Sequence, residues 1–324
     1  MQRHSALRGA RLVASVACVL AASLVLGGCG DGAGGGGSSG TAIASPSRTF
    51  VDTSRPTPQN GTAPGAPERT LVTQLWYLES PPRAAAACDR SGCGLVLLAH
   101  GFGGSTARLD SLGRALAGAG YVVAAPAFPL TNDHAPGPAP AIGDVVNQPG
   151  DLSFLVDRLL AASAERSDPL AGRVDGTRIG VVGHSLGGTT VLAWTRVPQT
   201  TDARVRAVVA VAPSVPLVLG FFGSAPLPSG PPTLLISGTD DMTVPHAQVR
   251  AFYDAILPAK AFLGIVGGHH SDVIENDPEP EAFVAPTEQS AVAFFDRFLG
   301  NTPWPLDSTL ATLAAQGEEV ASDF

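Results

Sequence analysis

Short runs of apolar residues recur along the chain between residues 71 and 266. Runs of this length that are apolar throughout are typical of strands buried on both faces of a parallel sheet. The runs that we expect to form strands are Leu71–Leu78, Leu95–Ala99, Tyr121–Ala125, Ile179–Gly183, Val205–Ala212, Thr233–Ser237 and Ala261–Val266, of which the first is the weakest.

Between these runs, apolar residues follow a helical period, as Leu152, Leu155 and Leu159 do. The segments that we expect to be helical are Thr106–Ala119, Asp151–Ala164, Leu186–Arg196, Pro245–Leu257 and Glu288–Leu299. Strands that alternate with helices in this way predict an α/β fold with a mostly parallel central sheet and helices on both faces. We expect residues 68–300 to form this single domain.

The beginning of the chain has the pattern of a targeting segment. Three arginines precede an apolar run from Leu12 to Leu26, which is shorter than the roughly 20 residues needed to cross a bilayer. The run ends in Leu26-Gly27-Gly28-Cys29, which resembles a bacterial lipobox. We therefore expect residues 1–28 to be a lipoprotein signal peptide and Cys29 to carry the lipid. Such a protein is exported and meets the membrane through its lipid anchor only. The alternatives are secretion after ordinary cleavage near Cys29, or an uncleaved anchor.

The segments on either side of the expected domain show no clear periodicity. Residues 29–67 are mainly Gly, Ser, Thr, Pro and Ala, a composition that predicts a disordered, flexible tether. Residues 301–324 contain one apolar patch, and we expect a C-terminal tail without chemistry of its own.

Charge and composition exclude several classes of function. The formal net charge of −8 becomes −11 if residues 1–28 and their three arginines are removed, and so acidic a chain is poorly suited to bind nucleic acid. No glycine-rich nucleotide motif occurs in the required context, and the four cysteines lack zinc-ligand spacing. We therefore expect no cofactor, no metal and no nucleic acid partner, and we expect a monomer.

The four cysteines divide into two pairs. Cys18 lies in the expected signal peptide and Cys29 at the lipidation site, which leaves Cys88 and Cys93. Export favours a disulfide between these two residues across a short loop. Two free thiols are the alternative.

The most informative motif follows the fourth expected strand. The sequence Gly183-His184-Ser185-Leu186-Gly187 fits G-x-S-x-G and stands between a strand and a helix, as a nucleophile elbow does. Glycines at both ends of the motif let the backbone cross closely in a tight turn that exposes the serine hydroxyl. We predict that Ser185 is a nucleophile and that His184 packs beside the elbow.

A nucleophilic serine needs a histidine base and an acid, which follow it along the chain in this type of site. The loop after the sixth expected strand contains Asp240 and Asp241, and the G-x-x-D-x-x-V-P spacing favours Asp241 as the acid. The loop after the last strand contains His269 and His270, and G-x-x-H spacing favours His270 as the base. Asp240 and His269 are the alternatives.

The negative charge that develops in acyl transfer needs N–H donors. We expect one from Leu186, the residue after the nucleophile. The other is expected from Phe102, in a turn that follows the second strand and reads His100-Gly101-Phe102-Gly103-Gly104. Gly101 belongs to this turn, and His100 is expected to brace it by hydrogen bonding.

These motifs, in this order, resemble the α/β-hydrolase fold over most of Leu95–Leu299. The turn at 100–104, the strand Tyr121–Pro126 and the segment Asn147–Leu159 are similar to the dienelactone-hydrolase-like group, which includes platelet-activating-factor acetylhydrolases and chlorophyllases. The elbow is also similar to that of secreted polyester hydrolases and cutinases. The chain has Ser185 where dienelactone hydrolases have cysteine, and Leu186 where polyester hydrolases often carry methionine.

The resemblance implies a cofactor-free serine hydrolase that cleaves carboxylic esters through an acyl-enzyme. The alternatives on the same triad are acyl transfer in the cell envelope, thioester hydrolysis and peptide cleavage, and a further alternative is an inactive binding lipoprotein. Lids of this fold often insert at Ser214–Pro232, which is short and rich in proline and glycine here. We therefore expect no substantial lid over the site.

Overall fold

The computed structural model describes residues 42–80, 87–275, 281–300 and 306–324. The expected signal peptide, the lipidation site Cys29 and the tether up to residue 41 lie outside these ranges. Among the helices in the described ranges, none is both long and apolar enough to cross a membrane.

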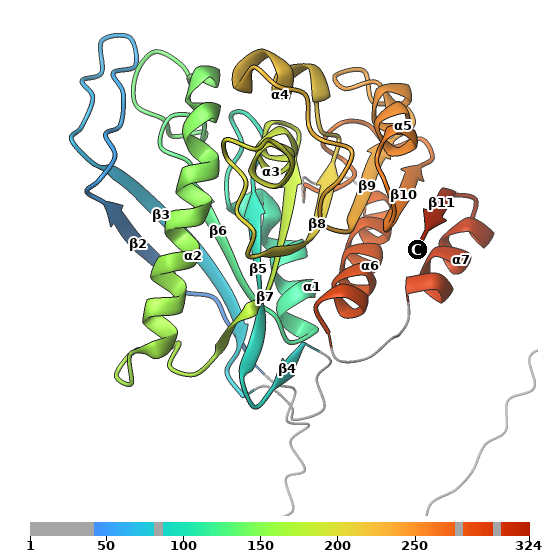
Figure 1. The fold of residues 1–324 in the computed structure, drawn as a ribbon, viewed down its shortest axis with the longest axis horizontal. Coiled ribbons are helices and arrows are strands. Elements are labelled where there is room, and N and C mark those ends of the chain that lie inside the picture. Colours follow the sequence, from blue (N-terminus) through green and yellow to red (C-terminus); the bar gives the residue numbers. More distant parts are fainter. Residues whose placement is uncertain (1–41, 81–86, 276–280, 301–305) are drawn as a thin grey trace, which may run out of the picture. The chain divides into compact units, whose positions relative to one another are not determined.

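A twisted sheet with a parallel centre forms the middle of the domain (Figure 1). Its parallel strands lie in the order β6, β5, β7, β8, β9, β10, and β3 joins them antiparallel to β6. These strands are β3 (Arg69–Leu78), β5 (Gly92–Ala99), β6 (Val122–Ala127), β7 (Val174–His184), β8 (Val205–Val211), β9 (Thr233–Gly238) and β10 (Lys260–Ile265). All seven strands expected from the apolar runs are present, and the mostly parallel sheet is confirmed.

Helices cover both faces of the sheet, as expected (Figure 1). The apolar core on one face includes side chains of α2 (Gln148–Ala164), α3 (Leu186–Arg196) and α5 (His246–Ala255). The core on the other face includes side chains of α1 (Asp110–Gly118), α6 (Glu281–Phe298) and α7 (Leu306–Ala315). Because the sheet is apolar on both sides, each face needs such a layer of helices to exclude water.

The expectation of a disordered tether is wrong for residues 42–67. Strands β1 (Ile43–Ala44) and β2 (Ser47–Asp52) pair antiparallel with β3, and residues 57–66 form a β-bridged hairpin. Phe50 turns into the core, and the buried Asp52 accepts hydrogen bonds from Ser54 and Arg55. Only one face of β2 is buried, so its residues alternate and leave no apolar run in the sequence.

The expected C-terminal tail is also part of the domain. Helix α7 buries Leu306, Leu310 and Leu313, which form the apolar patch of this segment. Strand β11 (Glu319–Asp323) then pairs antiparallel with β10 and closes that edge of the sheet. The domain therefore extends beyond the expected boundaries at both ends.

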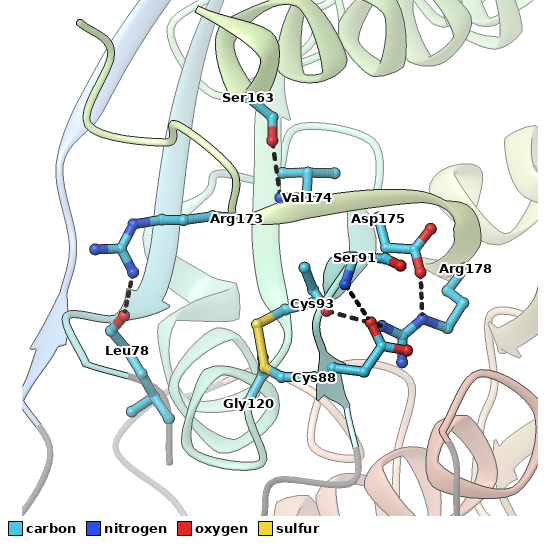
Figure 2. The surroundings of a disulfide bond; sticks show 12 residues. Leu78, Cys88, Ser91, Cys93, Gly120, Ser163, Arg173, Val174, Asp175 and Arg178 are labelled. Carbon is cyan, nitrogen blue, oxygen red and sulfur yellow. Dashed lines mark hydrogen bonds and ion pairs between the residues drawn. A yellow bond between two sulfur atoms is a disulfide. The ribbon is translucent and has the colours of Figure 1, made fainter. Parts of the chain in front are cut away.

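A disulfide joins Cys88 and Cys93, with an S–S distance of 2.09 Å, as expected (Figure 2). It closes the hairpin between β4 (Cys88–Asp89) and β5. Beside it, Arg178 forms ion pairs with Asp89 at 3.2 Å and with Asp175 at 2.8 Å. The hairpin is thereby tied to the N-terminal part of β7.

The segment Ser214–Pro232, where a lid could insert, contains one helix of eight residues, α4 (Val215–Phe222). Val218 of this helix packs into the same core as α3. Ser185 remains partly exposed to solvent beside it.

Candidate active site

Ser185 stands at the sharp turn between β7 and α3, in a backbone conformation that few residues other than glycine adopt. Its φ is 53° and its ψ is −113°. A Cβ at Gly183 would lie 2.2 Å from the carbonyl oxygen of Gly187, and a Cβ at Gly187 would lie 2.1 Å from that of Ala99. Only glycine fits at either position, and the turn holds the Ser185 hydroxyl beyond the end of the sheet.

A continuous chain of hydrogen bonds joins Ser185, His270 and Asp241. Nε2 of His270 lies 2.8 Å from Oγ of Ser185, and Nδ1 of His270 lies 2.7 Å from Oδ2 of Asp241. The three residues come from the end of β7 and from the loops after β10 and β9, which all meet at the carboxyl edge of the parallel strands. In this arrangement the histidine can take the serine proton while the carboxylate orients the ring.

Asp241 is held rigidly as an ionised acceptor. Its side chain is fully buried, and Oδ1 accepts hydrogen bonds of 2.8 Å from the main-chain N–H groups of Thr243 and Val244. Burial raises the pKa of Asp241, but the hydrogen bonds from His270 and Val244 outweigh it and hold that pKa below its ordinary value. The neighbouring Asp240 is exposed.

His269 points away from the serine, unlike His270. Its side chain is 65% exposed, and its Nδ1 lies 2.9 Å from Asp272. Of the two adjacent histidines, it is therefore His270 that the structure brings to Ser185.

The two residues expected to donate to an oxyanion belong to segments that adjoin Ser185. Leu186 is the first residue of α3, where a main-chain N–H has no partner within its own helix. Phe102 lies in the turn after β5, which approaches so closely that a Cβ on Gly101 would be 3.3 Å from Cβ of Ser185. Gly103 N–H donates to the Thr131 carbonyl and holds this turn in place.

His100 braces the same turn, and both of its ring nitrogens form hydrogen bonds there. Its Nε2 accepts a 3.1 Å hydrogen bond from the N–H of Phe128, so Nδ1 carries the proton and donates to the Gly101 carbonyl at 2.7 Å. Burial lowers the pKa of His100, which favours this neutral form.

Sequence reasoning missed one part of the site. His184 is buried as expected, but it also contacts the main chain of His270 and the carboxylate of Glu275. Glu275 in turn forms an ion pair with Arg108. These partners lie far from His184 along the chain, and no spacing in the sequence connects them.

Comparison with known proteins identifies a family and a common fold. The model of the PET hydrolase-like family matches residues 85–304, which is more than half of the chain. A solved structure of a ferulic acid esterase from Streptomyces cinnamoneus has a TM-score of 0.60 and 24% sequence identity, and the match covers 82% of this chain and 92% of that chain. The likeness to the esterase shows a common α/β-hydrolase fold.

Proposed function

Because the chain belongs to the PET hydrolase-like family and is a carboxylic ester hydrolase, we propose that it cleaves esters through an acyl-enzyme formed on Ser185. The hydrogen-bond chain from Ser185 through His270 to Asp241 is the observation that supports this mechanism. The strained backbone of Ser185 supports it further, because such strain is typical of a nucleophile elbow.

In this mechanism His270 takes the proton of Ser185 Oγ while Oγ attacks the ester carbonyl. Asp241 holds the ring and stabilises the positive charge that His270 gains. The main-chain N–H groups of Leu186 and Phe102 stabilise the oxyanion, an effect worth about 3 kcal/mol per donor. His270 then protonates the leaving alcohol. It next takes a proton from a water molecule that attacks the acyl-enzyme carbonyl, and it returns this proton to Ser185 Oγ as the acid product leaves.

The decisive experiment replaces the nucleophile. We expect Ser185→Ala to lower kcat on a p-nitrophenyl ester by at least about 10³-fold and to abolish labelling by a fluorophosphonate. Ser224→Ala is a matched control, because the Ser224 hydroxyl is exposed and donates to the carbonyl of the neighbouring Ala225. Wild-type turnover by Ser185→Ala would refute the proposed mechanism.

We also propose that the site accepts bulky and aromatic esters. Two exposed apolar side chains in the loops of the site support this: Phe102, next to Gly101 in sequence, is 47% exposed, and Met242, next to Asp241 in sequence, is 91% exposed. A series of p-nitrophenyl esters with increasing acyl size, together with a soluble aromatic diester, tests the proposal through kcat/KM. A steep loss of kcat/KM beyond the acetyl ester would contradict it.

For its location, we propose an exported lipoprotein anchored through Cys29. The segment Leu26–Cys29 supports this, as does the Cys88–Cys93 disulfide, because disulfides persist outside the reducing cytosol. Cys29→Ser should move the protein from the membrane fraction to the soluble fraction in the native host. Retention of the variant in the membrane fraction would contradict lipid anchoring.

A further inference from the structure

A buried imidazole beside the nucleophile links the loops that carry the reacting groups. His184 directly precedes Ser185 and is only 2% exposed. Its Nε2 lies 2.8 Å from the main-chain carbonyl oxygen of His270, and its ring centroid lies 5.0 Å from that of His270. Because a carbonyl oxygen can only accept, Nε2 of His184 is the donor in this hydrogen bond.

The other nitrogen of His184 faces a carboxylate. Nδ1 makes no hydrogen bond to a described residue but lies 3.4 Å from Oε1 of Glu275, whose Oε2 accepts a 2.8 Å hydrogen bond from Arg108. Glu275 is 5% exposed. Burial raises the pKa of Glu275, but the contacts with His184 and Arg108 outweigh it and lower that pKa to about 2.

The three groups connect three separate parts of the site. His184 belongs to the elbow, and Arg108 lies in the short helix η1 (Ala107–Leu109), which follows the turn that carries Phe102. Glu275 lies one turn beyond His270, where its N–H donates to the Ser271 carbonyl at 2.8 Å. The elbow, the short helix after the Phe102 turn and the loop that carries His270 are therefore joined through His184 and Glu275.

We propose that His184 is a positioning residue that holds the main chain of His270 at the distance from Ser185 that proton transfer requires. This inference rests on the proposed function of Ser185 and His270. Displacement of a reacting group by about 1 Å can lower the rate about 10²-fold. The hydrogen bond from His184 to the main-chain carbonyl of His270 therefore fixes the residue whose position the proton transfer depends on. Glu275 and Arg108 fix the orientation of the His184 ring.

The contacts of His184 are more specific than packing requires. An apolar ring would fill the same volume without any polar partner. In His184, by contrast, Nε2 donates a hydrogen bond to the main chain of His270, and Nδ1 faces the buried carboxylate of Glu275. The substitution His184→Phe therefore removes the positioning contacts and keeps the ring. His184→Gln keeps an N–H donor that can reach the His270 carbonyl.

The test compares these two variants with a matched control, His246→Phe. His246 is also a largely buried histidine, with Nδ1 at 2.8 Å from Ser237 and Nε2 at 3.0 Å from Glu319, but it lies in α5, outside the reacting groups. We expect His184→Phe to lower kcat about 10- to 100-fold with little change in KM. His184→Gln should recover most of this loss, and His246→Phe should leave kcat unchanged.

A double-mutant cycle with Glu275→Ala tests whether the carboxylate acts through His184. Glu275→Ala alone should lower kcat by roughly fivefold, and in the background of His184→Phe it should cause no further loss. If His184→Phe misfolds, the Glu275→Ala variant alone carries the test. A folded His184→Phe with kcat within twofold of wild type, an unchanged kcat in Glu275→Ala, or a His184→Gln as slow as His184→Phe would each overturn the proposal.

The outcome can be separated from a failure of the proposed function. If Ser185→Ala stays active or wild-type protein is not labelled by a fluorophosphonate, the proposed mechanism itself is wrong. If Ser185→Ala is inactive and the His184 and Glu275 variants turn over normally, only the positioning role of His184 is overturned.

Discussion

Adjacent residues in the two loops of the site have entirely different environments. Asp241 is buried and receives main-chain hydrogen bonds, whereas Asp240 is exposed. His270 reaches Ser185, whereas His269 faces solvent and Asp272. A shift of one position along an irregular loop turns a side chain to another side, so the function of each residue depends on the local backbone.

This difference predicts a large contrast between two conservative substitutions. We expect Asp241→Asn to lower kcat by about 10⁴-fold, because an amide no longer stabilises the protonated His270 or fixes its tautomer. Asp240→Asn removes the same charge one residue away and should leave kcat within about twofold. Steady-state kinetics on a p-nitrophenyl ester measures both. A greater loss in Asp240→Asn than in Asp241→Asn would reverse the assignment of the acid.

The depressed pKa of Glu275 predicts a pH dependence of stability. Its folded-state pKa of about 2 lies below the ordinary value of 4.5, so its ionised form stabilises the folded protein fully above about pH 4.5. This contribution is lost as the pH falls from 4.5 towards 2. We expect the melting temperature of wild type to fall more steeply in that window than that of Glu275→Gln, as thermal unfolding monitored by circular dichroism would show. Parallel curves for the two proteins would contradict this prediction.

At the scale of elements, a buried ion cluster fastens the first long strand to the helical layer. Arg69, at the start of β3, is fully buried and donates two hydrogen bonds each to Asp144 and Asp151. Asp144 lies in the short helix η2 (Ile142–Asn147) and Asp151 in the first turn of α2. The cluster therefore sets the position of α2 against the edge of the sheet.

Loss of the cation from this cluster should destabilise the fold strongly. We expect Arg69→Met to lower the free energy of unfolding by about 3–5 kcal/mol, because it leaves buried carboxylates without their main partner. Arg114→Met is the control, since Arg114 and Asp110 form a surface pair at 2.7 Å with side chains 47% and 40% exposed. That variant should stay within about 0.5 kcal/mol of wild type. Urea denaturation of both variants measures the difference, and equal effects would contradict the role of the cluster.

The burial of each strand decides whether it can be predicted from a single sequence. The central strands are buried on both faces, as all residues of β9 and β10 are, and such strands appear as largely apolar runs. The edge strand β2 buries two of its six residues and β11 buries none fully, and both read as polar segments. Helix α4 contains Pro216 and Gly220, which hide its helical pattern.

The candidate site follows the same division between local and distant information. Ser185, Asp241 and His270 stand in short motifs with fixed spacing, so each can be found from its neighbours in sequence. The link from Arg108 to Glu275 joins residues 167 positions apart and arises only when β5, β7 and β10 assemble in one sheet. Motifs thus identify the candidate residues that the structure brings together, and the fold determines what holds them in place.

In the domain as a whole, the N-terminal and C-terminal segments of the described residues form the two edges of one sheet. β1 and β2 cover β3, and β11 covers β10. The N-terminal segment is also tied to α2 and to the turn after it, because Arg55 pairs with Asp151 at 2.8 Å and Arg48 with Asp168 at 2.8 Å. An open edge invites pairing with other chains, and the short polar strands β2 and β11 present a less adhesive edge than β3 and β10 would, so these terminal segments should also reduce aggregation.

Truncation tests whether residues 42–67 belong to the domain. We compare a chain that begins at Ala42 with one that begins at Glu68, which lacks β1, β2 and the hairpin. The shorter chain loses the burial of Phe50, worth about 2 kcal/mol, and the ion pairs of Arg48 and Arg55. It should melt at least about 4 °C lower and aggregate at concentrations where the longer chain stays soluble.

The reactivity of Ser185 is the control for folding of the shorter chain. Ser185 should still react with a fluorophosphonate below the melting transition, because the residues of the site come from β7 and the loops after β9 and β10. Equal melting temperatures and solubility for the two chains would show that residues 42–67 add nothing to the domain, as a tether would.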